Sequence, residues 1–181
     1  HLKIEDSAGW DHQTIQLLAA KDSGVGPLST LILTGYAFND FDIQTLASSG
    51  SPFASVTALW LAGNRITDKG VAALAASDSA FVSLTTLDLG YTLTTDAGVA
   101  ALAAPNSRLS TLTTLYLYGN SVTDAGMTAI SAPGSALAGL STLDLRGTQI
   151  TDAGVVALAA EGSALTRLST LNLFGTQVSD A

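Results

Sequence analysis

The sequence has no cysteine, which excludes disulfide bonds and thiolate metal ligands. Charged residues are also scarce, at 12% of the 181 residues, and acids outnumber bases, so the formal net charge is −8. The chain therefore lacks the basic face that nucleic acids or an anionic membrane surface would require. No run of about 18 apolar residues occurs, so no segment is predicted to span a bilayer. We expect neither a nucleic-acid partner nor membrane insertion.

Catalytic and metal-binding signatures are missing as well. The sequence contains no H-E-x-x-H, G-x-S-x-G or phosphate-loop motif. Its two histidines, His1 and His12, lie near the N-terminus, and the sequence places no acid–base partner beside either. The glycine-rich segment GVGPLS at 24–29 precedes a predicted strand rather than a helix, which indicates a loop. We predict that the chain is not an enzyme and has no cofactor and no metal site.

What the sequence does contain is an internal repeat with a period of 28 residues. Pairs of leucines in an L-x-L pattern return at this step without insertion, at Leu31/Leu33, Leu59/Leu61, Leu87/Leu89, Leu115/Leu117, Leu143/Leu145 and Leu171/Leu173. Further apolar columns keep the same step, among them Phe38, Ile66, Thr94, Val122, Ile150 and Val178. Thr94 is the polar exception in that column, and we expect the neighbouring Leu93 to compensate for it.

Within each repeat the apolar spacing changes from that of a strand to that of a helix. Leu143 and Leu145 alternate, whereas Val155 and Leu158 have helical spacing. Asp152, between them, is predicted to be the N-cap of a helix that begins at the next residue. The same interpretation covers the whole column, Asp40, Asp68, Asp96, Asp124, Asp152 and Asp180, in which His12 also falls. A ladder of calcium ions is disfavoured, because one column supplies too few of the about six to eight oxygens that calcium takes.

These repeats resemble a known family. The segment Val56–Asp68, VTALWLAGNRITD, fits the pattern L-x-x-L-x-L-x-x-N-x-I-x-D of a leucine-rich repeat. The period of 28 residues and the helical segment TDAGVAALAA resemble the ribonuclease-inhibitor-like subfamily. The resemblance implies an α/β fold, a curved leucine-rich-repeat solenoid with parallel strands on the concave face and short helices on the convex face. Stacked repeats bury a continuous core that a single repeat lacks.

The resemblance covers the whole chain unevenly. We expect one domain over 1–181 with about six and a half repeats, in which 1–27 form a divergent first repeat because HLKIE is one residue out of phase. The family's turn asparagine is kept at Asn64 and Asn120, and is replaced by Tyr36, Thr92, Thr148 and Thr176. The chain stops at VSDA, where another helix would begin, so we expect an uncapped end. Such an end indicates a fragment of a longer array or an end that packs on another copy.

The variable positions surround the L-x-L pair. Alternation puts the residues before, between and after the two leucines on the face opposite to the core. The column before the pair is nearly uniform: Thr30, Ala58, Thr86, Thr114, Thr142 and Thr170. The columns between and after the leucines are diverse, and their large or charged members are our candidate partner-binding residues: Trp60, Asp88, Tyr116, Tyr118, Asp144, Arg146 and Phe174.

Exposed aromatic and charged residues on one rigid sheet are typical of an interface. The alternative is that aromatic residues stand there because strands favour them, and threonine fits an exposed strand for the same reason. Ice binding by the threonine column would need a flat face of threonine alone, which Trp60, Tyr116 and Arg146 interrupt. Arg146 also has a competing role, which is to neutralise Asp144.

The resemblance implies a non-enzymatic scaffold that binds a protein or glycan ligand on its concave face. The alternative is an extracellular or cell-surface structural or adhesive protein whose repeats assemble into a filament or lattice and carry O-glycans. The low charge, the many serines and threonines and the uncapped end favour this alternative. They also favour self-association through the open C-terminal end. The aromatic residues of the concave face favour the scaffold. For the location, extracellular or cell surface is favoured over cytoplasmic.

Overall fold

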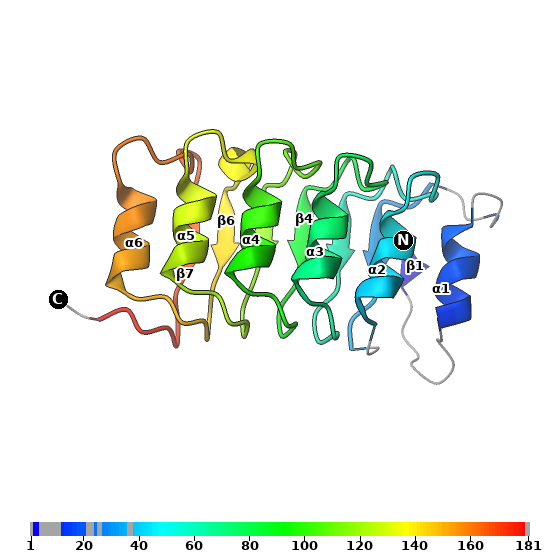
Figure 1. Cartoon of the computed structure of the whole chain (residues 1–181), viewed down its shortest axis with the longest axis horizontal. Helices are drawn as coiled ribbons and strands as arrows, with labels where there is room; N and C mark the ends of the chain where they lie inside the picture. The colour runs from blue at the N-terminus through cyan, green and yellow to red at the C-terminus, as the bar shows by residue number, and fades with distance from the viewer. Residues whose placement is uncertain (1, 4–11, 21–23, 25–26, 36–37, 180–181) are drawn as a thin grey trace.

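A strip of parallel strands and a row of short helices form the two layers of the protein (Figure 1). The computed structural model describes residues 2–3, 12–20, 24, 27–35 and 38–179. Within these residues one sheet contains seven strands in the order of the sequence. They are β1 (Leu2–Lys3), β2 (Thr30–Ile32), β3 (Ala58–Trp60), β4 (Thr86–Asp88), β5 (Thr114–Tyr116), β6 (Thr142–Asp144) and β7 (Thr170–Asn172).

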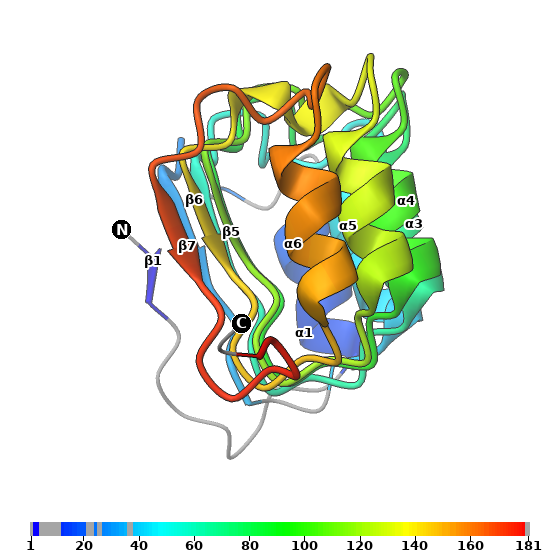
Figure 2. The ribbon, with the colours of Figure 1, turned by 90° about the vertical axis from the view of Figure 1, so that its left-hand side faces the viewer.

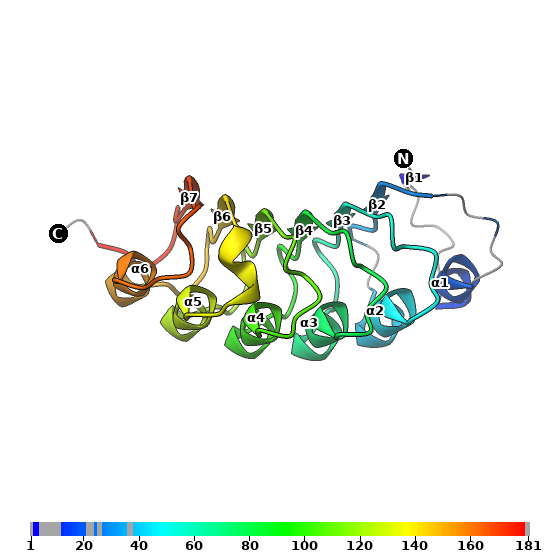
Figure 3. The same ribbon diagram turned by 90° about the horizontal axis from the view of Figure 1, so that it is seen from above.

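The helices all cover the same face of the sheet (Figure 2). They are α1 (His12–Ala19), α2 (Asp40–Ala47), α3 (Asp68–Ala75), α4 (Asp96–Ala103), α5 (Asp124–Ser131) and α6 (Asp152–Ala159), with a 3-10 turn η1 (Ala136–Gly139) before β6. Seen from above, both rows follow one curve, with the strands on its inner side and the helices on its outer side (Figure 3). This confirms the predicted fold class, a curved α/β solenoid with a concave strand face and a convex helix face.

The strand register reproduces the sequence period. Leu59 pairs with Leu87, and Leu87 with Leu115, so each leucine lies beside its equivalent 28 residues later. At the N-terminal edge Leu2 pairs with Leu31, which makes that one step a residue longer. The one-residue phase shift predicted for HLKIE is therefore present in the sheet.

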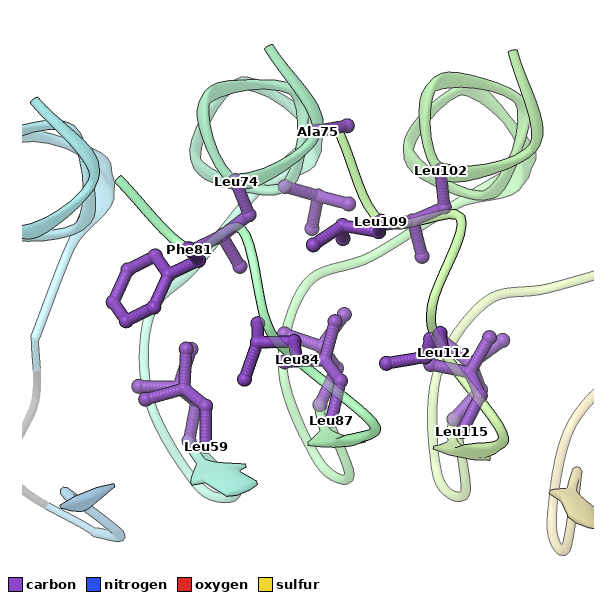
Figure 4. Close-up of a cluster of buried hydrophobic side chains, with 14 of the residues drawn as sticks. Leu59, Leu74, Ala75, Phe81, Leu84, Leu87, Leu102, Leu109, Leu112 and Leu115 are labelled. Carbon is purple, nitrogen blue, oxygen red and sulfur yellow. The ribbon is translucent and has the colours of Figure 1, made fainter. Parts of the chain in front are cut away.

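The core lies between the two layers. Figure 4 shows Leu59, Leu87 and Leu115 of successive strands pointing toward Leu74 of α3 and Leu102 of α4. All five side chains are fully buried. Because every repeat contributes the same positions, the buried leucines form one continuous column rather than separate clusters.

The helix starts differ from the sequence prediction. Helix α6 begins at Asp152, and its N-cap is Thr151, whose hydroxyl accepts a hydrogen bond from the backbone N–H of Ala153 at 3.2 Å. Thr67, Thr95 and Thr123 cap α3, α4 and α5 in the same way, and Asn39 caps α2. The assignment of the aspartates as N-caps is therefore wrong by one position. Threonine is also a good capping residue, and its use here leaves the aspartate side chain available for another bond.

That aspartate joins one repeat to the next. Asp96 Oδ2 accepts a hydrogen bond from the Thr123 hydroxyl at 2.6 Å, and its Oδ1 accepts from the backbone N–H of Thr123 at 2.8 Å. Oδ1 also accepts from the N–H of Gly126 at 2.9 Å. A Cβ on Gly126 would lie 2.7 Å from Asp96 Oδ1, which explains a glycine inside this short helix. We call this arrangement the aspartate clamp. In each clamp an aspartate accepts hydrogen bonds from the following repeat, and the aspartates are Asp40, Asp68, Asp96, Asp124 and Asp152.

Two members of the predicted cap column are outside this description. Asp180 lies outside the described residues, as does the side chain of His12, although His12 is the first residue of α1. His1 and Tyr36 also lie outside the described residues.

The turn asparagines and threonines differ in the number of repeats to which they donate hydrogen bonds. Asn120 Nδ2 donates to the carbonyl oxygens of Leu117, in its own repeat, and of Leu89, in the preceding repeat, at 3.0 and 2.7 Å. Thr148 replaces this asparagine and donates to its own repeat at Leu145, at 2.6 Å. Threonine therefore performs part of the asparagine's role, as the residue chemistry predicts.

The polar exception in the apolar column is accommodated in place. Thr94 is fully buried and shares a hydrogen bond of 2.8 Å with the hydroxyl of Thr92. Leu93 is 58% exposed, so the expectation that it compensates for Thr94 is wrong. The repeat keeps its register because the threonine hydroxyl is satisfied locally.

Candidate functional site

The concave face carries the predicted partner-binding residues on β3 to β7 and in the turns that follow these strands. Trp60, Tyr116 and Tyr118 are half-buried there. Arg146 and Phe174 are exposed, and Phe174 is 82% exposed. These five residues therefore present side chains to solvent, as the alternation of the strands predicts.

The two acids of the predicted site are not exposed. Asp88 is 4% and Asp144 is 5% exposed, so the expectation that these two acids are exposed on the concave face is wrong. The sheet register places Asp88 between Trp60 and Tyr116, whose rings are stacked with centroids 5.8 Å apart and planes 26° apart. The large neighbours reach across the intervening strand, because an aspartate side chain is too short to keep them apart.

Tyr118 and a backbone amide satisfy the buried Asp88. The backbone N–H of Gly90 donates to Oδ1 at 2.8 Å, and the Tyr118 hydroxyl donates to Oδ2 at 3.2 Å. Burial raises the pKa of Asp88, although these two hydrogen bonds act in the opposite direction. Burial, followed by the charge and the hydrogen bond of Asp88, raises the pKa of Tyr118 to about 12. The Tyr118 hydroxyl therefore stays protonated, and a donor, further into the alkaline range.

Arg146 combines an ion pair with a ring contact. Its Nε lies 2.9 Å from both carboxylate oxygens of Asp144, and its Nη2 lies 2.7 Å from Oδ2. The guanidinium carbon also lies 5.2 Å from the ring centroid of Tyr118, which is within cation–π distance. The neutralising role that the sequence left open for Arg146 is therefore present. The pair leaves the Arg146 side chain 47% exposed, so its outer edge still faces solvent.

Tyr91 belongs to the same cluster, and the sequence analysis missed it. Its ring meets that of Tyr118 edge to face, with centroids 5.3 Å apart and planes 83° apart. Its backbone is left-handed, with φ of 50°, at a position where other repeats have glycine: Gly35, Gly63, Gly119, Gly147 and Gly175. The break in this glycine column is visible in the sequence and is the signal that would have identified Tyr91.

Two glycines, Gly90 and Gly119, make room for the rings of Tyr118 and Tyr91. A Cβ on Gly90 would lie 2.1 Å from the ring of Tyr118, so only glycine lets that ring cross toward Asp88. The ring of Tyr91 covers Gly119 in turn, where a Cβ would lie 2.4 Å from it. The two aromatic side chains therefore depend on glycines in the neighbouring repeats.

These side chains surround a hollow of about 480 Å³ at the carboxyl ends of the strands. We call it the aromatic hollow; it is lined by Tyr91, Tyr118, Gly119, Arg146, Gly147, Phe174 and Gly175. Its volume falls within the range of about 300–1,000 Å³ that is typical of ligand pockets. Three of the lining residues belong to the predicted site, whereas Trp60 and Tyr116 lie outside the hollow on the strands.

The described part of the chain has neither a cluster of metal ligands nor a membrane-spanning helix. There, no group of three or more His, Cys, Asp or Glu side chains is arranged to hold a metal ion. Across the same residues, no helix has both the length and the apolar character needed to cross a membrane.

A family model and a solved structure agree with this architecture. A family model described as Leucine Rich repeat matches residues 54–75, 108–131 and 140–159. No curated protein sequence matches the chain. Among solved structures, an internalin (inlF) from Listeria monocytogenes has a TM-score of 0.52 at 19% identity over 83% of this chain. The plant peptide hormone receptor RGFR1 in complex with RGF2 has a TM-score of 0.46 at 18% identity over 83% of this chain.

The chain is much shorter than these two proteins. It spans 36% of the internalin chain and 21% of the receptor chain. At this level of identity the likeness to internalin concerns the fold alone. The assignment to the ribonuclease-inhibitor-like subfamily remains a prediction. The matched segments and the strand–helix solenoid show that the chain contains leucine-rich repeats.

Proposed function

We propose that the protein is a non-enzymatic scaffold that binds a peptide or protein ligand across its concave face. The observation that carries this proposal is the stacked pair of Trp60 and Tyr116, which leaves two large rings half-exposed on the strands. Tryptophan, tyrosine and arginine are the residues that most often dominate binding energy at interfaces. Tyr118 and Arg146 extend the same surface toward the aromatic hollow.

The hydrogen bonds beneath this face support the proposal, because they fix Tyr118 and Arg146 before a ligand arrives. Asp88 holds the Tyr118 hydroxyl, and Asp144 holds the Arg146 guanidinium. A side chain that is already ordered loses less conformational entropy when it binds, and a larger part of the contact energy then appears as affinity. The buried acids thus act through the residues that they position.

The experiment starts from peptides selected on the full chain from a random display library. Backbone amide shifts on titration should change along β3 to β6, and Trp60→Ala and Tyr116→Ala should each weaken binding by about tenfold or more. Lys69→Ala and Glu161→Ala are the matched controls, because both residues are exposed outside the concave face. Loss of binding in these two controls, with retention in the Trp60 and Tyr116 variants, would place the ligand on the other face.

A second candidate function is self-association of the repeats into an assembly. Leu171 of β7 and Val178 are each 36% exposed, whereas their equivalents Leu143 and Ile150 are fully buried. Exposed apolar surface of this kind favours association between copies. Light scattering over a range of protein concentrations tests it: the mass should grow with concentration, and a constant monomeric mass would exclude the assembly.

A further inference from the structure

We propose that the aromatic hollow binds a proline-rich peptide segment in the polyproline II conformation. The inference rests on the proposed function, because the hollow forms one end of the concave face and the proposal names the chemistry of its ligand. Four observations carry it: the backbone of Tyr91, the glycine floor, the unused hydrogen-bond donors, and the lack of net charge at the hollow.

Tyr91 is the only non-glycine residue with positive φ among the described residues. A left-handed backbone is unfavourable for a residue with a side chain, and such strain is typical of functional positions. The ring of Tyr91 contributes little to the core, since the residue is 69% exposed. Tyr91 stands where other repeats have glycine, and its ring forms one wall of the hollow. Its backbone keeps the left-handed conformation, which is unfavourable for tyrosine.

The floor of the hollow is bare backbone. The ring of Tyr91 covers Gly119 at one end, and Gly147 and Gly175 of the next two repeats line the floor toward the exposed Phe174. A Cβ placed on Gly147 would find its nearest neighbour, the backbone nitrogen of Gly119, 3.9 Å away. The φ of 65° at Gly147 favours glycine. No neighbouring side chain lies within 4 Å of a Cβ at this position, so the space above it is open. The result is an open apolar slot with aromatic sides, into which a flat aliphatic ring fits.

Two side chains of the hollow offer hydrogen-bond donors to a ligand. The carboxylates of Asp88 and Asp144 are buried and already accept bonds, so they are closed to a ligand. Arg146 binds Asp144 through Nε and Nη2, which leaves the N–H groups of Nη1 for another acceptor. The hydroxyl of the exposed Tyr91 is a second donor at the rim. A ligand with exposed carbonyl oxygens can accept hydrogen bonds from both groups.

A proline-rich segment has this character. Each proline supplies a carbonyl oxygen and has no backbone N–H. The polyproline II helix makes no internal hydrogen bonds, so its carbonyl oxygens remain available, and it docks into aromatic-lined grooves at low entropic cost. A sugar would need acceptors for its hydroxyl protons, and the two carboxylates that could supply them are occupied. The observations therefore favour the peptide over a glycan.

The charge of the hollow and of the whole protein also favours an uncharged ligand. Arg146 is neutralised by Asp144, so the hollow has no net positive charge with which to attract an acidic ligand. The protein as a whole has a net charge of −8, which repels acidic ligands at long range. The uncharged proline-rich segment avoids this repulsion, and its affinity should change little between low and high salt.

The test uses capped decaproline as the probe and the full chain labelled for amide NMR. Decaproline should shift the amides of Gly119, Gly147 and Gly175, and its affinity by calorimetry should fall by about tenfold or more in Tyr91→Gly and Phe174→Ala. Lys69→Ala is the control: it should bind decaproline like the wild type, because Lys69 is exposed outside the concave face. Thermal unfolding of each variant checks its folding, and the highly exposed Phe174 can be changed without disturbing the core.

Several results would overturn the inference. Failure of the wild type to bind decaproline would do so, and so would decaproline binding that persists in both the Tyr91 and the Phe174 variants. Cello- and chito-oligosaccharides are the second arm, and their binding to the hollow in the absence of decaproline binding would make it a glycan site. If selected peptides still map to Trp60 and Tyr116 in either case, the proposed function stands while this inference fails.

Discussion

At the scale of single residues, neighbouring repeats decide what a side chain can do. Tyr118 crosses to Asp88 because residue 90 is glycine, and Tyr91 covers Gly119 because that residue has no side chain. Neither aromatic residue is explained by its own repeat. Their positions follow from the 28-residue step, which brings equivalent turns side by side.

The bond between Asp88 and Tyr118 predicts an altered tyrosine titration. Asp88→Asn should lower the pKa of Tyr118 from about 12 toward its ordinary value of 10, because the variant removes a negative charge that disfavours tyrosinate. Burial is the largest cause of the rise and remains, so only part of the shift should be lost. Absorbance of tyrosinate during alkaline titration measures this change.

The matched variant for this titration is Tyr118→Phe. It should remove the late titration step and leave the other tyrosine steps in place. A late step that persists in Tyr118→Phe would belong to another tyrosine and would contradict the assignment.

At the scale of elements, the aspartate clamp links the start of each helix to the repeat before it. The Thr123 hydroxyl donates its single proton to Asp96, so its lone pair is free to accept the N–H of Ala125. One carboxylate thus orients the cap of the next helix and also binds Gly126. This coupling joins two helices through polar contacts in addition to the buried leucines.

Loss of one clamp should destabilise the whole solenoid. Asp96→Ala removes the acceptor for three hydrogen bonds, and we expect it to lower the free energy of unfolding by about 1–3 kcal/mol. Urea denaturation measures this change. Asp78→Ala is the control, because Asp78 is exposed at the surface and should change stability by less than about 0.5 kcal/mol. Addition of EDTA should change neither value, and a shift in the wild-type midpoint with EDTA would indicate a bound metal instead.

The clamp also predicts how stability depends on pH. Hydrogen bonds from the hydroxyl and then the backbone N–H of Thr151 lower the pKa of Asp124 below its ordinary value of 3.8. A carboxylate with a lowered pKa in the folded state stabilises the protein above its unfolded pKa, and that contribution is lost as the pH falls through the folded value. Asp124→Asn should therefore be less stable than the wild type at neutral pH, and the difference should close in acid. Guanidinium midpoints at several pH values test this, and a gap that widened in acid would contradict it.

At the scale of the whole molecule, the regular step made the fold predictable. Because Leu59, Leu87 and Leu115 recur without insertion, the strands, the helices and the curved two-layer arrangement followed from spacing and resemblance. The cap was assigned to aspartate because threonine and aspartate are adjacent and both are good capping residues. The burial of Asp88 depends on how two rings tilt across a strand, which no one-dimensional pattern specifies.

The stacking of repeats also predicts a gradient of stability along the solenoid. Leu115 of β5 is fully buried between neighbouring repeats, whereas its equivalent Leu171 of β7 is 36% exposed. Leu115→Ala should cost about 2–5 kcal/mol, as is usual for a truncated core leucine. Leu171→Ala should cost clearly less, because its side chain has less buried surface to lose. Urea denaturation of the two variants measures both values.

Amide hydrogen exchange should show the same gradient without any mutation. Each repeat contacts its nearest neighbours, so opening can begin at one repeat without unfolding the rest. Protection should be highest in β4 and β5, whose strand neighbours are present on both sides, and lower in β7, which pairs with β6 alone within the described residues. Uniform protection from β4 to β7 would mean that the solenoid unfolds as a single cooperative unit. Equal costs for Leu115→Ala and Leu171→Ala would contradict the effect expected from their difference in burial.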